Sequence, residues 1–417
     1  MEQRRAVTAK TASRYKRARK KEKRAILDEF IKLTEYTRTY ARRVLRQHGQ
    51  RVTVDERTVV VADARQRSPR ARSRFYDDKV VAALIKIWRL MDYLCGKRLV
   101  AVLPEIVRKL EQHGELHCEA QTRKKLLRIS AATIDRLLRP ERRKYELRGR
   151  SRTKPGTLLK HQIPIRTFAD WDENRPGFVE VDLVAHEGGV AAGDYCQTLD
   201  MTDIATTWTE LLAVRNKAQV WVFEALQKLR KNLPFPLLGL DSDNGGEFIN
   251  AQLEHYCKEQ KITFTRSRPY RKNDNCFVEQ KNFSVVRRAV GYARYDTEEQ
   301  LQLLNGLYSY LRLYTNFFMP SMKLKSKERN GSKVKKHYDE AQTPYQRVLA
   351  SRHVTKQNKQ QLRAKYETLN PAALKRKIDT LERRLTRSVS RSQQMPARAR
   401  KLSAGATRNP RNVNAKP

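Results

Sequence analysis

Three acidic residues stand where the sequence pattern would bring them to one place. Asp243 follows an apolar run, 236–240, that predicts a buried strand, and the Asn-Gly turn after it places Asp243 at the C-terminal edge of a sheet. Asp182 ends an earlier strand-like run from 178, and Glu279 starts a helix that would pack back over that edge. Carboxylates gathered at one spot repel one another, so the cluster is tolerable only with cations between them. A pair of Mg²⁺ ions held this way is suited to displacement at a phosphodiester.

Other acidic residues compete with these three. Asp241 and Glu180 each precede one of them by two residues, and therefore lie on the same face of the same predicted strand. Spacing and the Asn-Gly turn favour Asp243 over Asp241. We interpret the remaining neighbours as structural, in strand-end or turn positions, at a helix N-terminus or in the core: Asp200, Asp203, Glu247 and His186.

The elements that must position the three carboxylates form one series. The hydrophobic period changes from helical to extended near residue 178, and glycines at 188 and 189 predict a hairpin turn. The patterns predict strands at 178–185, 191–201 and 205–214, a helix at 217–233, a strand at 236–240, a helix at 247–260, a strand at 262–266 and a helix from 276 to 294. This order predicts an α/β fold, a mixed five-strand sheet with helices on its faces.

The series and its motifs resemble the ribonuclease H-like catalytic core of retroviral integrases and bacterial insertion-sequence transposases. The run Asp243-Asn244-Gly245-x-Glu247-Phe248 is similar to the sequence around that family's second catalytic aspartate. Thirty-five residues separate Asp243 from Glu279, the typical interval in the family. The residues around the last position, Pro269-Tyr270, Asn273 and Val278-Glu279-Gln280-Lys281-Asn282, resemble the surroundings of its catalytic glutamate. The similarity covers residues 170–295. No His-His-Cys-Cys zinc module precedes it, and Gln280 and Lys281 replace an Arg of some relatives.

The resemblance implies a divalent-metal-dependent DNA transposase or integrase of the Asp-Asp-Glu type. Asp182, Asp243 and Glu279 would be both catalytic residues and ligands of two Mg²⁺ ions, for which Mn²⁺ would substitute. The reaction would cut an element end and join its 3′-hydroxyl to target DNA. The implied partners are double-stranded DNA and further copies of the chain assembled on it, while a need for an accessory ATPase stays open.

Composition agrees with a nucleic-acid partner. The chain has 88 Lys and Arg against 45 Asp and Glu, a net charge of +43 over 417 residues, which favours a polyanion. No apolar run approaches the roughly 20 residues of a membrane span, and the N-terminus lacks an apolar signal segment. The five scattered cysteines predict reduced thiols, and His113, His117 and Cys118 lack a partner motif for zinc. We therefore expect a bacterial cytoplasmic, nucleoid-associated protein.

Basic helical segments precede the predicted sheet. Residues 25–50 predict two short helices joined by a tight turn, a helix-turn-helix pattern, and residues 76–140 predict a second helical DNA-binding module. The alternative for each is an ordinary helical hairpin with a solvated basic face. The DNA-contacting residues we expect are those on the outward faces of these helices and those that flank the carboxylates: Arg38, Arg42, Arg43, Arg46, Arg136, Arg139, Arg271, Lys272, Lys281, Arg287 and Arg288.

The segments between and after these modules complete the predicted organisation. We expect a basic arm at 1–24, linkers at 51–75 and 141–169, and the catalytic core at 170–315. After the core we expect a small β-rich region at 316–350, a helical segment at 351–387 and a disordered basic tail at 388–417.

Two other functions compete with the transposase hypothesis. The first is a DNA-binding regulator whose integrase-like core is inactive, and the intact carboxylate set argues against it. The second is a ribonuclease H-like nuclease that hydrolyses DNA without strand transfer, and the predicted DNA-reading modules argue against that. A Mg²⁺-dependent cleavage assay separates the regulator from the enzymes.

Overall fold

The computed structural model describes residues 2–55, 58–62, 75–144, 174–190, 192–243, 245–266, 276–330 and 333–394. The chain divides into two compact units, Met1–Phe75 and Tyr76–Pro417. Several sequence predictions fall outside the described residues: Arg271 and Lys272, the Pro-Tyr and Asn motif at 269–273, and most of the segments at 141–169 and 388–417.

The first unit is a small helical bundle with a hairpin. Its elements are α1 (Glu2–Arg17), α2 (Lys20–Thr34), α3 (Arg38–Gln47), β1 (Gln50–Asp55) and β2 (Thr58–Ala62). The segment expected to be a basic arm is largely α1, because Ala12 and Tyr15 recur on one face and are buried against the aromatic and aliphatic side chains of α2 and α3. Part of the expected linker at 51–75 forms the antiparallel pair β1–β2.

The second unit begins with a four-helix module, α4 (Asp78–Leu90), α5 (Gly96–Gln112), α6 (Ala120–Leu127) and α7 (Ala131–Arg143). Ser130 caps α7, since its side chain accepts from Thr133 N at 3.3 Å. Helix α7 runs through Pro140 and ends at Arg143. Helices α5 and α7 approach so closely that a Cβ at Gly96 would lie 2.2 Å from the carbonyl oxygen of Ala131.

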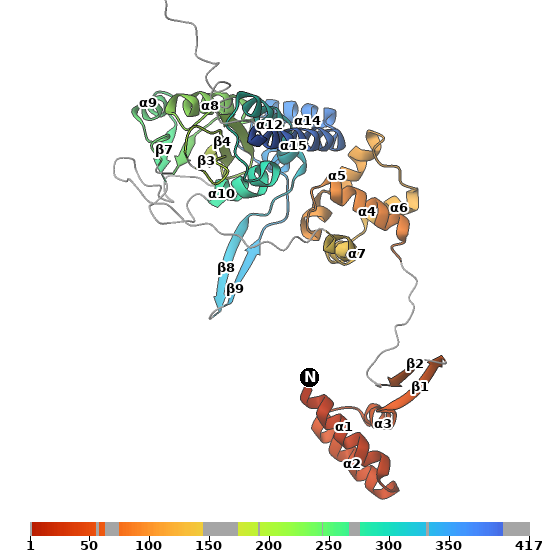
Figure 1. Cartoon of the computed structure of the whole chain (residues 1–417). Helices are drawn as coiled ribbons and strands as arrows, with labels where there is room; N and C mark the ends of the chain where they lie inside the picture. The colour runs from red at the N-terminus through yellow and green to blue at the C-terminus, as the bar shows by residue number, and fades with distance from the viewer. Residues whose placement is uncertain are drawn as a thin grey trace, which may run out of the picture. The chain divides into compact units, whose positions relative to one another are not determined.

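The centre of the unit is a five-stranded mixed sheet (Figure 1). Its strands are β3 (Phe178–Ala185), β4 (Gln197–Asp203), β5 (Thr209–Val214), β6 (Gly239–Ser242) and β7 (Thr263–Arg266). They lie in the order β5-β4-β3-β6-β7, with β3–β4 and β4–β5 antiparallel and β3–β6 and β6–β7 parallel. This topology is the ribonuclease H-like sheet that the sequence predicts.

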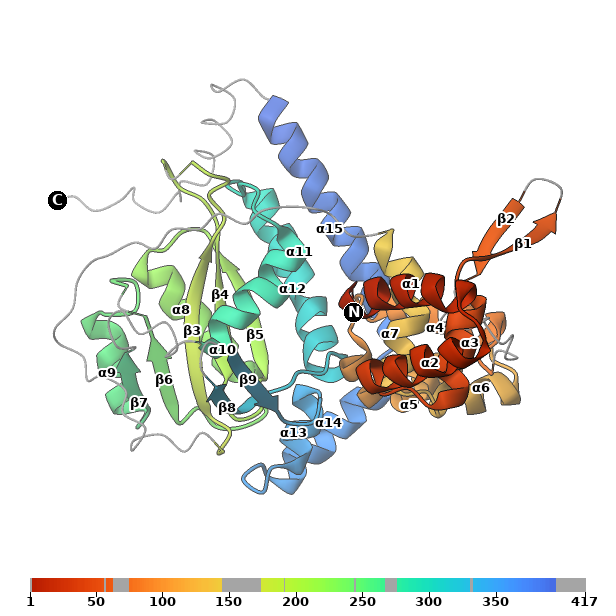
Figure 2. The same ribbon diagram turned by 90° about the horizontal axis from the view of Figure 1, so that it is seen from below.

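Helices cover both faces of the sheet, as Figure 2 shows. On one face α8 (Gln219–Asn232) and α9 (Ala251–Glu259) pack on alternate strand residues such as Val179, Val181 and Leu240. The other face carries α10 (Cys276–Lys281), a π-helical turn over Asn282–Arg287, α11 (Arg288–Val290) and α12 (Glu298–Phe318). Side chains alternate along a strand. Glu180, Asp182 and Asp241 therefore belong to the α10 face.

The C-terminal elements tie the helical module to the sheet. After the hairpin β8 (Leu324–Asn330) and β9 (Lys333–Tyr338) come α13 (Pro344–Ala350), α14 (Lys356–Thr368) and α15 (Pro371–Gln394), and α15 packs on α12, α4 and α5. The fully buried Lys109 of α5 binds the Glu367 carboxylate of α14 at 2.8 Å, and its amine lies 4.6 Å from the Tyr366 ring centroid. The region expected to be β-rich at 316–350 is thus a hairpin between helices. None of the helices in the described ranges combines the length and apolar character that crossing a bilayer requires.

Candidate active site

Asp182 lies on β3, and Asp243 directly follows the neighbouring parallel strand β6, at the same level of the sheet. In the β3–β6 register Glu180 is opposite Asp241 and Val181 is opposite Ser242. Asp182 and Asp243 are the next residues along their chains, and both side chains are half-buried. The strand-to-turn transition after β6 therefore places the two carboxylates side by side, as the sequence predicts for this edge.

Helix α10 packs on the face of the sheet that carries Asp182. Asn282, one turn after Glu279, donates from Nδ2 to Asp182 Oδ2 at 2.6 Å. The other Asp182 oxygen accepts from its neighbour's backbone N–H, Leu183 N, at 2.8 Å, and Asp243 Oδ1 accepts from Gly245 N at 3.1 Å. Glu279 is an exposed residue of α10. The sheet edge and the helix thus bring the three predicted residues into one neighbourhood.

The electrostatics of the pair reflect burial and mutual repulsion. Burial first, and then the negative charges of Asp243 and, to a smaller extent, Glu279, raise the pKa of Asp182 to about 7 against the opposing hydrogen bonds. The pKa of Asp243 is also raised, first by burial and then by the Glu247 carboxylate, against the Gly245 N–H. Ionising both aspartates is costly without a cation, and a divalent ion would remove that cost.

The two competing carboxylates do structural work. Glu180 is fully buried, and its Oε2 accepts from the backbone N–H groups of Phe277 and Val278, both at 2.9 Å. These are N–H groups of the first turn of α10, which lack partners inside the helix. Asp241 is also fully buried and accepts from Thr265 Oγ1 at 2.5 Å. Glu180 therefore anchors the helix that carries Glu279.

The remaining candidates have structural surroundings. Asp203 accepts from Gly177 N at 2.8 Å and from Thr206 N at 2.7 Å, at the end of β4. His186 is buried, its Nε2 is 2.7 Å from Thr198 Oγ1, and burial lowers its pKa to about 3. Asp200 is opposite Asp182 in the β3–β4 register, and burial raises its pKa to about 8.

The donor set fits a hard divalent cation in its chemistry. Three carboxylates offer oxygen ligands, the type that Mg²⁺ prefers. In the described ranges, however, no three His, Cys, Asp or Glu side chains are already assembled to hold a metal ion. Asp182 and Asp243 would supply the half-buried part of such a set, and the exposed Glu279 side chain would complete it. His113 contributes instead to packing, with Nε2 3.2 Å from the carbonyl oxygen of Leu369.

The expected DNA-contacting residues differ in what they touch. Arg42, Arg43 and Arg46 of α3 are exposed, as are Arg136 and Arg139 of α7. Three arginines bind other groups of the protein: Arg38 pairs with Asp28, Arg287 donates to Ala185 O at 2.7 Å, and Arg288 pairs with Asp92 at 2.8 Å. Lys281 is buried.

Sequence reasoning missed two contacts that shape the site. Asn282 belonged to the recognised motif without a stated role, and only the register of β3 against α10 shows that it holds Asp182. Glu180 was weighed as a rival ligand, and its anchoring contact spans 97 residues to Phe277. The sequence shows two carboxylates, Glu180 and Asp182, two residues apart on one strand. This spacing does not indicate which of the two contacts the helix.

Comparison with known proteins places the chain in a family. No family model matches it. It is 42% identical over 327 residues to the uncharacterized protein y4rM of Sinorhizobium fredii, an alignment that covers 78% of this chain and 89% of that protein. The chain belongs to the family of y4rM.

Solved structures similar to the chain include three retroviral integrases. They are the catalytic core domain of BIV integrase (18% identity, TM-score 0.28, covering 41% of this chain and 91% of that one), the HTLV-2 integrase catalytic core domain in complex with magnesium (13%, 0.28, 36% and 93%), and the simian T-cell lymphotropic virus intasome in complex with PP2A regulatory subunit B56 gamma (16%, 0.26, 44% and 60%). The order of the strands in the sheet of this chain identifies its fold.

Proposed function

We propose that this protein is a DNA transposase or integrase of the Asp-Asp-Glu type, which cuts element ends and joins them to target DNA. The observation that carries the proposal is the paired placement of Asp182 on β3 and Asp243 directly after β6, beneath the helix that bears Glu279. Their charges interact strongly enough to contribute to the raised pKa of Asp182. Such a cluster on a strongly basic chain fits chemistry on a polyanion.

The proposed metal ligands are Asp182, Asp243 and Glu279. Two bound Mg²⁺ ions, or Mn²⁺ in their place, would supply an activated oxygen nucleophile and stabilise the leaving oxygen in an in-line displacement. Asn282 would hold one Asp182 oxygen, and the Leu183 N–H the other, so that the carboxylate keeps its orientation. Glu180 would fix the start of α10 and, through it, the position of Glu279.

The proposed partner is double-stranded DNA, both as element end and as target. The exposed arginines of α3 and α7 would bind its phosphates, and several copies of the chain would assemble on the ends. A bacterial, nucleoid-associated location follows from this proposal.

The decisive experiment is strand transfer with purified full-length protein on duplexes taken from the DNA that flanks the coding region. The native chain should cut and join them with Mg²⁺, and Glu279→Gln should abolish both steps while leaving DNA binding nearly intact. Glu259→Gln, an exposed carboxylate on α9, is the matched control and should stay active. Strand transfer by the Glu279→Gln protein would overturn the assignment.

The rival functions give different results in the same assay. A ribonuclease H-like nuclease would release cut ends without joined products. A DNA-binding regulator would bind the duplex and leave it uncut with any divalent ion.

A further inference from the structure

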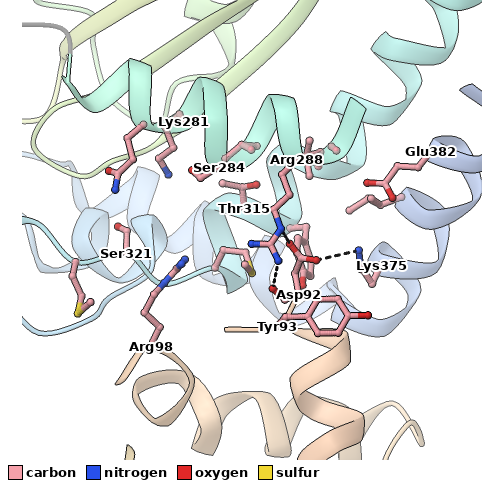
Figure 3. Close-up of a pocket in the computed structure, with 18 of the residues that line it drawn as sticks. Asp92, Tyr93, Arg98, Lys281, Ser284, Arg288, Thr315, Ser321, Lys375 and Glu382 are labelled. Carbon is pink, nitrogen blue, oxygen red and sulfur yellow. Dashed lines mark hydrogen bonds and ion pairs between the residues drawn. The ribbon is translucent and has the colours of Figure 1, made fainter. Parts of the chain in front are cut away.

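A pocket of about 430 Å³ lies beside α10, in the second unit of the chain. Its walls come from the loop before α5 and the start of α5, from α10 and the π-helical turn, from the end of α12, and from α15. Figure 3 shows the labelled side chains of Arg98 and Lys281 pointing into this space from opposite walls. The volume is within the range of small-ligand sites.

Most of the charges that line the pocket neutralise one another. Arg288 Nε lies 2.8 Å from Asp92 Oδ2, and Lys375 Nζ lies 2.9 Å from Asp379 Oδ1 and 3.8 Å from Asp92 Oδ1. Burial raises the pKa of the remaining acid, Glu382, to about 7, which reduces its negative charge at neutral pH. Two cations, Arg98 and Lys281, are left to set the character of the pocket.

These two cations are incompletely satisfied within the described part of the chain. Arg98 donates from Nε to Pro320 O at 2.6 Å, and its two terminal amino groups make no further hydrogen bond to the residues that the structure describes. Lys281 is only 7% exposed and makes no hydrogen bond there either. Its nearest compensation is the buried Asp200, whose Oδ2 is itself without a hydrogen-bond partner among the described residues. A buried ammonium in this position gains from an anion that completes its donors.

The cations are also close enough to repel each other. The positive charges of Arg98 and Arg347 repel that of Lys281, and Asp200 attracts it. Burial lowers the pKa of Arg98, and Arg288 adds to the effect. Hydroxyl groups complete the lining between them, from Ser284, Thr315 and Ser321. Donors that converge from several directions match the oxygens of a tetrahedral anion.

We propose that this pocket binds a phosphate group, held by Arg98 and Lys281 with the neighbouring serine hydroxyls. The phosphate comes either from the backbone of a bound DNA strand or from a free phosphate-bearing small molecule. Because Lys281 follows Glu279 by two residues on α10, an occupied pocket contacts the helix that carries Glu279. The proposal does not require the carboxylates to cut DNA, so it stands or falls separately from the proposed function.

Calorimetric titration of the full-length protein with inorganic phosphate, against chloride at equal ionic strength, tests the site. The native chain should bind phosphate, and Arg98→Gln should weaken binding at least tenfold. Lys97→Gln removes an exposed cation from the adjacent position of α5 and should leave the affinity unchanged. No phosphate binding by the native chain, or equal losses in both variants, would overturn the proposal.

A second variant addresses Lys281 without leaving a buried charge unpaired. Lys281→Met combined with Asp200→Asn removes both buried ionisable groups and nearly keeps the side-chain volumes. This double variant should melt cooperatively and bind phosphate at least tenfold more weakly than the native chain. Native-like phosphate affinity would mean that Lys281 is only the counter-ion of Asp200, and the proposal would fail.

The source of the phosphate follows from the same titration with a duplex of about 20 base pairs already bound, in the absence of divalent ions. Loss of phosphate binding in the presence of duplex assigns the pocket to a DNA backbone phosphate. An unchanged affinity assigns it to a free phosphate compound.

Discussion

Glu180 and Asp182 lie on β3 and face the same side of the sheet, while Asp241 lies on β6 and Asp243 directly follows that strand. The inner pair, Glu180 and Asp241, is fully buried and bound to donors of α10 and β7. The outer pair, Asp182 and Asp243, is half-buried and has raised pKa values. One step of two residues along a strand thus separates carboxylates that hold the fold from carboxylates that are open to a ligand.

One face of the sheet thus carries carboxylates with two different roles, in stability and in the proposed activity. The inner carboxylates accept hydrogen bonds from protein groups instead of water, so their removal should lower the stability of the fold. The outer carboxylates keep unused oxygen lone pairs at a cost in electrostatic energy, so that their removal should cost activity. A stability–activity trade-off of this kind is expected at functional sites. The predictions below test this separation.

The largest effect is expected from the outer pair. Asp182→Asn or Asp243→Asn should lower the rate of Mg²⁺-dependent cleavage about a thousandfold or more, since a lost metal ligand removes ~4 kcal/mol of transition-state stabilisation. Melting temperature without metal should stay equal or rise, because a repelling charge is gone. Cleavage kinetics and calorimetry measure the two quantities. If either variant cleaved DNA at the native rate, the substituted aspartate would not belong to the active site.

The next effect is expected from the inner pair. Glu180→Ala leaves two N–H groups of α10 without an acceptor, at ~1–3 kcal/mol each, so the free energy of unfolding should fall by ~2–6 kcal/mol. Glu180→Gln keeps one acceptor oxygen and should lose about half as much. Chemical denaturation measures both. Equal losses in the two variants would show that the hydrogen bonds to α10 are not what Glu180 contributes.

A smaller effect is expected from pH. Burial raises the pKa of Asp203 to about 6 and of Asp200 to about 8. At a pH between the ordinary aspartate pKa and these raised values, the two carboxyl groups are deprotonated in the unfolded chain and protonated in the folded chain. The stability of the metal-free protein should therefore fall as the pH rises from about 4 to about 8.

Asp200→Asn provides the control for this pH dependence. It should make the fall in stability shallower from about pH 4 to 8, because the Asp200 carboxyl contributes across that whole interval, and most clearly above pH 7. Melting curves across the range check this. An unchanged slope in the variant would mean that Asp200 is ionised in the folded protein.

The smallest effect on the chemistry itself is expected from α3, far from either pair in the sequence. Arg42→Gln, Arg43→Gln and Arg46→Gln together should weaken duplex binding and reduce the slope of log affinity against log salt by up to about three units. Cleavage at saturating protein should remain native. Arg14→Gln, which removes a cation that pairs with Glu29 across the bundle, is the control and should leave the slope in place.

Much of the fold could be predicted from the sequence because its signals are local. Apolar runs and the turns that bound them predict the five strands and their order, and the Asn-Gly turn places Asp243 at the end of β6. Element ends were less predictable: the first helical turn was expected at 247, and α9 begins at Ala251 because Asn250 caps it. The helix expected from 276 to 294 is interrupted by a π-helical turn, and α11 ends at Val290.

The contacts that distinguish the two carboxylate pairs could not be predicted, because they join residues distant in sequence. Thr265 meets Asp241 across 24 residues, and Asn282 meets Asp182 across 100. Because side chains alternate along a strand, carboxylates two residues apart face the same side of the sheet. The alternation does not show at which of these positions a helix packs on the sheet. The interaction of Arg98 with Pro320, across 222 residues, lies beyond sequence patterns for the same reason.

Helix α15 has a consequence for the way the chain is made. It packs on α12, α4 and α5, and its Arg376 pairs with Glu115 across 261 residues. During synthesis the N-terminal part of the unit leaves the ribosome long before this helix exists, and domains fold as units. A growing chain would therefore lack the clamp that joins the helical module to the sheet. The contacts that join the helical module to the sheet can therefore form only after α15 has been synthesised.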